Sequence, residues 1–168
     1  PYTNGEVLIA HCDFETNESF MTWKNFDLDG KVLSIFFNQA KPWYWTYELQ
    51  TEIPKSNSVM AATSMFSSNS VDQVIPADDW LFSMPLEIPQ SGSYGASWDA
   101  RSLMEAYPET YEMRVIEDAT LTELEAIFEK NQTPLKEASK ILVANSDLIY
   151  TIYHESGEWV NRKINLDA

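Results

Sequence analysis

Acidic side chains that could bind a metal ion gather in the N-terminal part of the chain, at Asp13, Glu15, Asp27 and Asp29. A Ca²⁺ ion takes six to eight oxygen ligands, and two or three carboxylates with backbone carbonyls would supply them. The spacing is not that of an EF-hand, because Asn38 stands where that loop, counted from Asp27, requires a glutamate. The alternative is a solvated turn in which the aspartates accept hydrogen bonds from their own backbone.

A second group of side chains is aromatic and lies in the segment 41–49. In a strand, successive side chains point to opposite faces, so Trp43, Trp45 and Tyr47 share one face and Tyr44 lies on the other. Sugar rings stack on exposed aromatic faces, which makes Trp43, Tyr44 and Trp45 candidate ligand-binding residues. The alternative is that Trp43, Trp45 and Tyr47 fill a hydrophobic core.

The sequence offers little for catalysis, since it has no GxSxG, HExxH or P-loop motif. His11 and Cys12 are neighbours in a predicted strand, so their side chains point apart and form no dyad. The pair Asp78 and Asp79 could serve as a glycosidase acid and base, but among 26 acidic residues such proximity is expected by chance. We therefore expect no enzyme and nominate no catalytic residue.

The elements that position these residues are mostly short strands. Alternating or apolar runs predict strands at 6–15, 32–37, 41–49, 59–66, 80–88, 92–102, 110–118, 140–144, 148–155 and 158–166. Segment 16–31 is expected to be a loop. One helix is predicted over 121–130, with Thr120 and Glu123 as a capping box. Many short strands with one brief helix favour an all-β sandwich or barrel in a single domain over 1–168.

The composition limits the partners. The chain has 168 residues with 11 Lys and Arg against 26 Asp and Glu, a formal net charge of −15. Such a chain repels nucleic acid and anionic membranes and attracts cations. Its one cysteine, Cys12, allows neither an internal disulfide nor a cysteine-based zinc site. No 18-residue apolar run exists, so we expect no direct membrane insertion.

The segment Asp78–Ile88, DDWLFSMPLEI, resembles a "DDWLxSPPI" stretch of the cleaved-adhesin and choice-of-anchor J domains of Bacteroidetes surface proteins. Met84 stands where that family commonly has proline. Shorter stretches that resemble the family occur in the same order along the chain: Asp13–Glu15 with Trp23 and Asp27–Gly30, Ser97–Ala100, Tyr107–Glu109 with Tyr111–Val115, and Glu158–Leu166.

The resemblance implies a jelly-roll β-sandwich related to vertebrate MAM domains, in an exported or cell-surface protein. It also implies a structural Ca²⁺ held by Glu15 with Asp27 or Asp29. The family continues for about two strands beyond the position of Asp167–Ala168, so relative to it the chain is C-terminally truncated. A sheet edge left open there would favour self-association by strand pairing.

The function expected from these observations is a non-catalytic adhesion module that binds a host or microbial glycan or a surface protein. One alternative is a structural spacer beside a catalytic domain. The other, less favoured, is a carbohydrate-active enzyme that uses paired acids.

Overall fold

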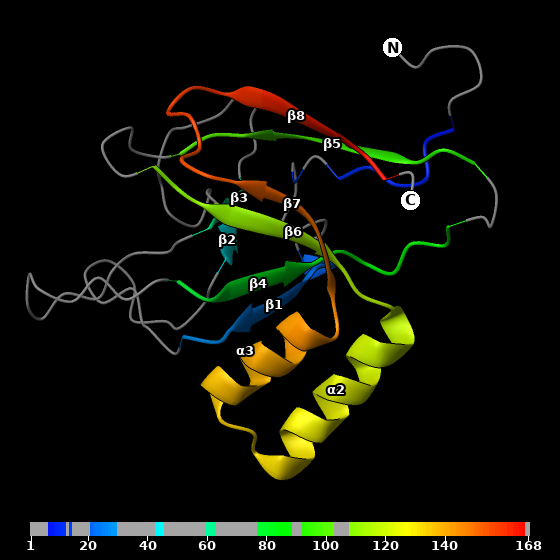
Figure 1. The fold of residues 1–168 in the computed structure, drawn as a ribbon, viewed down its shortest axis with the longest axis vertical. Helices are drawn as coiled ribbons and strands as arrows, with labels where there is room; N and C mark the ends of the chain where they lie inside the picture. The colour runs from blue at the N-terminus through cyan, green and yellow to red at the C-terminus, as the bar shows by residue number, and fades with distance from the viewer. Residues whose placement is uncertain are drawn as a thin grey trace, which may run out of the picture. The chain divides into compact units, whose positions relative to one another are not determined.

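The computed structural model describes residues 7–12, 14, 21–29, 43–45, 60–62, 77–88, 92–102 and 108–166. The chain divides into two compact units, Pro1–Ile88 and Pro89–Ala168. The described part consists of four two-stranded antiparallel sheets and two helices (Figure 1). It is mainly β, as predicted. The jelly-roll arrangement and the single domain over 1–168 stay predictions.

The first unit contains two small sheets. Strand β1 (Lys24–Asp27) pairs with β4 (Asp79–Phe82), and β2 (Trp43–Trp45) pairs with β3 (Met60–Ala62). Strand β1 lies inside the segment 16–31 that was expected to be a loop, so that prediction was wrong there. Its partner β4 supplies the backbone hydrogen bonds that stabilise it, and such a long-range pairing leaves no local signal.

Strand β4 is shorter than the predicted strand 80–88. Trp80 and Phe82 stack on the same side of it, with ring centroids 5.6 Å apart, and Phe26 of β1 meets Phe82 edge-on. The strand ends before Pro85, because a proline cannot donate a hydrogen bond to a ladder. The predicted strand 6–15 was also wrong where it is described, since residues 7–12 form no strand and Val7 is exposed.

The second unit holds two longer sheets. Strand β5 (Gly95–Ala100) pairs with β8 (Val160–Asn165), and β6 (Tyr111–Val115) pairs with β7 (Asp147–Ile152). The predicted alternation of β5 is confirmed: Ala96 and Trp98 are half-buried, and Ser97 and Asp99 are exposed.

The alternation predicted for β6 holds only for its first half. The register shifts between Met113 and Arg114, where Ile149 of β7 is the extra residue of a β-bulge. The sequence alternation predicts Tyr111, Met113 and Val115 on one face and Glu112 and Arg114 on the other, but Arg114 is half-buried and Val115 is exposed.

Two helices, α2 (Asp118–Asn131) and α3 (Leu135–Ala144), connect β6 to β7. Helix α2 was predicted, but Glu117 precedes its first turn without a side-chain cap, so the capping box of Thr120 and Glu123 was wrong. It ends at Asn131, and the left-handed backbone of the next residue, Gln132 (φ 48°), lets the Thr133 N–H reach the Phe128 carbonyl at 3.1 Å.

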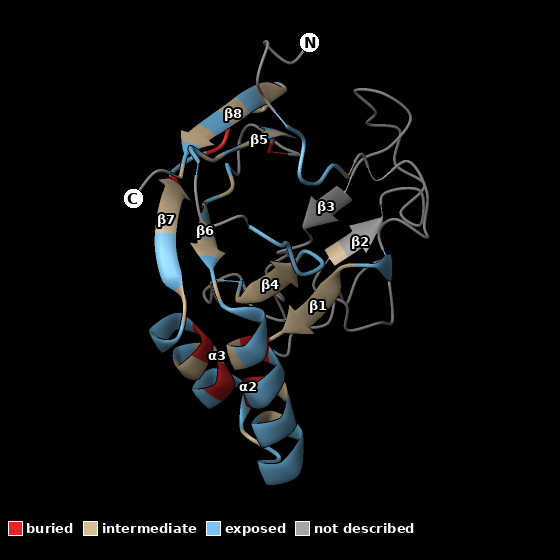
Figure 2. Cartoon of the chain, turned by 90° about the vertical axis from the view of Figure 1, so that its right-hand side faces the viewer, coloured by how far each residue is buried: buried red, intermediate tan, exposed pale blue. Residues whose placement is uncertain are grey.

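Helix α3 includes 140–144, which had been predicted as a strand. That prediction was wrong because a short apolar run fits either structure, and here Ala138 and Leu142, one turn apart, are both buried. They lie with Leu121 and Leu124 where α2 and α3 face each other (Figure 2).

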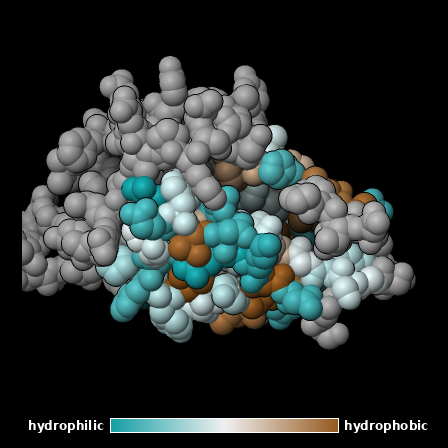
Figure 3. Space-filling model, turned by 90° about the horizontal axis from the view of Figure 1, so that it is seen from above, coloured by the Kyte–Doolittle hydropathy of each residue, from teal (hydrophilic) through white to brown (hydrophobic). Residues whose placement is uncertain are grey.

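The described surface drawn in Figure 3 mixes hydrophilic side chains with scattered hydrophobic ones. Within the described residues, no helix combines the length and the apolar character that crossing a membrane requires.

Candidate functional site

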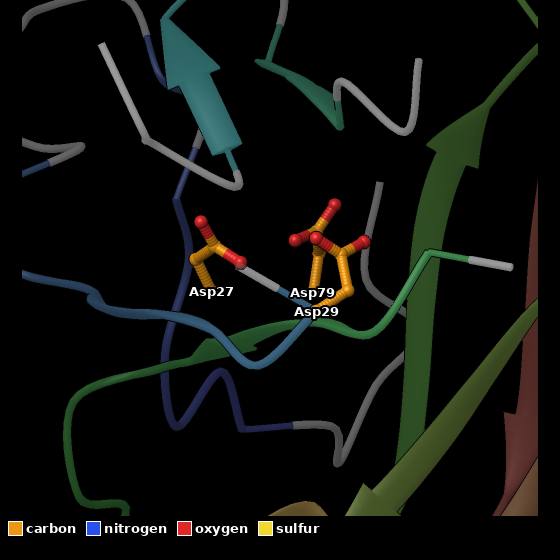
Figure 4. Close-up of side chains that lie close together, drawn as sticks. All are labelled: Asp27, Asp29 and Asp79. Carbon is orange, nitrogen blue, oxygen red and sulfur yellow. The ribbon is translucent and has the colours of Figure 1, made fainter. Parts of the chain in front are cut away.

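Three aspartates converge at one end of the β1–β4 sheet in the first unit. Asp27 ends β1, Asp79 begins β4, and the two are register partners. Asp29 follows β1 by two residues. One carboxylate oxygen from each lies within 4.8 Å of the others (Figure 4). Residues about fifty positions apart in the sequence thus form one cluster.

Backbone contacts hold the two chain segments together at this end. The Leu28 N–H donates to the Asp78 carbonyl at 2.9 Å, which extends the β1–β4 ladder by one bond. The Asp78 N–H donates to Asp29 Oδ2 at 3.3 Å, and so positions that carboxylate. Leu28, only 6% exposed, anchors the turn between Asp27 and Asp29 in the interior.

The neighbouring Asp78 does a different job. Its Oδ1 accepts a hydrogen bond from Trp80 Nε1 at 2.8 Å, which fixes the indole that stacks on Phe82. Adjacent residues in an extended chain point to opposite sides. Asp78 therefore points to the face of the sheet that carries the aromatic rings, while Asp79 points to the opposite face and joins the cluster.

The donor set of the cluster fits a hard divalent cation. Two oxygens bound to one Ca²⁺ at 2.3–2.6 Å lie at most about 5 Å apart, and the three oxygens satisfy that limit. All three ligands are carboxylates, which Ca²⁺ and Mg²⁺ prefer. Zinc sites, by contrast, are typically built from nitrogen and sulfur ligands. A bound cation would also reduce the repulsion between carboxylates that lie this close together.

The cluster contains two of the three predicted metal ligands, Asp27 and Asp29. The third, Glu15, lies outside the described residues, as does Asp13. Asp79 was missed as a ligand. The only signal for it was the pairing of its segment with β1, which a single sequence does not reveal.

The predicted ligand-binding residues are described only in part. Trp43, Tyr44 and Trp45 form β2, which confirms that this segment is a strand. Trp43 is half-buried, and its Nε1 is buried without a hydrogen-bond partner. Nothing is described of the side chains of Tyr44 and Trp45, and Tyr47 lies outside the described residues. Ligand binding at Trp43, Tyr44 and Trp45 stays a prediction.

A second polar cluster, in the other unit, was not predicted at all. Glu155 is 2% exposed and accepts hydrogen bonds from Tyr111 Oη at 2.8 Å, Arg162 Nη2 at 2.6 Å and the Ser156 N–H at 2.8 Å. Tyr111 in turn accepts from Trp98 Nε1 at 2.9 Å. These four linked side chains come from β5, β6, β8 and the turn before β8.

The pKa values in this cluster follow from its geometry. Burial by itself raises the pKa of Glu155, but the hydrogen bonds from Arg162, Tyr111 and Ser156 outweigh it and lower the pKa below its usual value. Burial raises the pKa of Tyr111 to about 12, and Glu155 adds to that effect while the Trp98 hydrogen bond opposes it. Both groups are thus held in their ordinary protonation states, which suits a structural role.

Comparison of the chain with protein-family models, with curated proteins and with solved structures gives no match.

Proposed function

We propose that this chain is a non-catalytic binding module of an exported surface protein, with a Ca²⁺ ion held by Asp27, Asp29 and Asp79. The observation that carries the proposal is the convergence of these three carboxylates at the end of the β1–β4 sheet. The ion would neutralise their mutual repulsion and join two segments that are distant in sequence.

The binding role is supported by the segment that resembles the adhesin domains. Its first three residues all contribute to this end of the sheet: Asp78 accepts a hydrogen bond from the indole of Trp80, and Asp79 adds a carboxylate to the cluster. The part of the chain with the most specific resemblance therefore builds the proposed metal site. In this role the ion stabilises the fold, and no reaction step depends on it.

The proposal is tested by thermal unfolding of the chain in EDTA and in millimolar Ca²⁺. A ligand that binds only the folded state stabilises it by about 2.7 kcal/mol when its concentration is a hundred times the dissociation constant. We expect Ca²⁺ to raise the melting temperature by several degrees and to raise it more than Mg²⁺ does. Asp79→Asn should abolish most of that increase.

The matched control is Glu87→Gln, which removes one exposed carboxylate of the same unit outside the cluster. It should leave the Ca²⁺ effect intact. If the melting temperature of the unsubstituted chain does not respond to Ca²⁺, or if both variants respond alike, the metal site is refuted.

A further inference from the structure

The three arginines of the chain differ in how their guanidinium groups are satisfied. Arg162 binds the buried carboxylate of Glu155, and Arg114 donates to Glu112 Oε2 at 2.7 Å and to the Ser146 carbonyl at 3.3 Å. Arg101, by contrast, makes no hydrogen bond or ion pair with a described residue. Its Nε is buried and has no hydrogen-bond partner.

An arginine in this state is unusual in a chain with 26 acidic residues. A guanidinium has five N–H donors, and a donor that is removed from water without an acceptor destabilises the folded state. The buried Nε is out of reach of a ligand, but the two terminal nitrogens are not buried and carry four N–H donors that a ligand can reach.

Arg101 is held in place by an aromatic ring. Its guanidinium carbon lies 5.8 Å from the centroid of the Trp159 ring. The two residues lie opposite each other, one position beyond the last register pair of the β5–β8 sheet, Ala100 with Val160. Contact with an aromatic face orients a guanidinium and leaves its N–H groups, which lie in its plane, able to donate.

The exposed face of the same sheet continues from this pair with polar residues. Asp99 pairs with Asn161, whose Nδ2 donates to Asp99 Oδ1 at 3.0 Å, and Ser97 pairs with Lys163. All four are exposed. At about 3.4 Å per residue, the face extends about 14 Å from Ser97 to Arg101.

We propose that Arg101 and Trp159 bind the carboxylate end of an acidic sugar, such as a uronic acid, that lies along the exposed face of β5 and β8. This inference rests on the binding role proposed above and names a ligand class for it. A carboxylate matches the planar fork of a guanidinium with two parallel hydrogen bonds. The neighbouring carboxylate, amide and ammonium groups offer both donors and acceptors for sugar hydroxyls.

The test is calorimetric titration of the full chain with a uronic-acid oligosaccharide and with the neutral hexose oligosaccharide of the same linkage. We expect the acidic probe to bind at least about tenfold more tightly, since a charge-assisted bidentate pair is about twice as strong as a neutral hydrogen bond. Arg101→Gln should remove that preference, and Arg101→Lys should keep only part of it because an ammonium has no planar fork.

The control is Lys136→Gln, which makes the same charge change at an exposed position of α3 and should bind like the unsubstituted chain. The melting temperature of Arg101→Gln should be nearly unchanged, which excludes misfolding as the cause of lost binding. Equal affinity for both probes, or full acid preference in Arg101→Gln, overturns the inference but leaves the binding role standing. If neither probe binds, the inference is overturned. If a peptide binds through its C-terminal carboxylate while the acidic sugar does not, the inference is also overturned, and the site is reassigned to peptide recognition.

Discussion

Glu155 shows how a single carboxylate can link strands of two different sheets. It is buried, yet Arg162, Tyr111 and the Ser156 backbone satisfy both of its oxygens. A buried carboxylate with this many donors stays ionised, so its lowered pKa and its hydrogen bonds have the same cause. Removing its charge would leave the half-buried Arg162 without its partner.

Glu155→Gln should therefore lower the free energy of unfolding by about 2 kcal/mol at pH 7, less than for a fully buried pair because Arg162 is partly exposed. The pKa of Glu155 is lower in the folded chain than in the unfolded chain. Its contribution is thus complete above the usual value of 4.5 and is lost as the pH falls through the folded-state value. The cost of the substitution, measured by urea unfolding, should shrink below pH 4.5.

The control for this experiment is Glu137→Gln, whose ion pair with Lys140 is largely exposed. It should cost less than about 1 kcal/mol at pH 7. If Glu155→Gln lowers the free energy of unfolding by an equally small amount, or by an amount that does not change with pH, the charge of Glu155 does not stabilise the fold.

At the scale of elements, the sequence predicted what depends on local alternation and missed what depends on distant partners. The alternation of β5 was visible because one face is buried and the other exposed. The burial of Arg114 in β6 was not visible, because its guanidinium donates to the Val143 and Ser146 carbonyls, which lie far along the chain at the end of α3. The candidate metal site divides in the same way: Asp27 and Asp29 are local, whereas Asp79 joins them only through the β1–β4 pairing.

The segment 140–144 was predicted as a strand but belongs to helix α3, and this disagreement can be tested by mutation. Leu142→Ala should lower the free energy of unfolding by about 2–5 kcal/mol, because Leu142 is completely buried and its loss leaves a cavity. The neighbouring Val143 is 42% exposed, and Val143→Ala should cost less than about 1 kcal/mol. In a strand that buried Val143 and exposed Leu142, Val143→Ala would be the more destabilising of the two substitutions. Urea unfolding of both variants, with circular dichroism to measure helix content, therefore decides between the structures.

At the scale of the whole molecule, the two compact units carry different candidate sites. The aspartate cluster belongs to Pro1–Ile88, and the Glu155 network and the Arg101 site belong to Pro89–Ala168. The net charge of −15 attracts cations to the chain as a whole. The attraction of an anionic ligand to Arg101 therefore depends on the charge and hydrogen bonds of that residue alone.

We expect the two units to unfold separately, so that calorimetry resolves two components. Ca²⁺ should shift the component that Asp79→Asn lowers, and Leu142→Ala should lower the other, since these residues belong to different units. A single transition that moves with both substitutions would instead support one cooperative domain over 1–168.

The register of β6 and β7 has a consequence for how much this region can vary in length. Val115 and Asp147 are partners at the end of the ladder, so the strands are already joined where the two helices begin and end. The helical pair takes the place that a tight turn has in a simple β-hairpin. Related chains could exchange 116–146 for a shorter or longer connection and keep every hydrogen bond between these two strands.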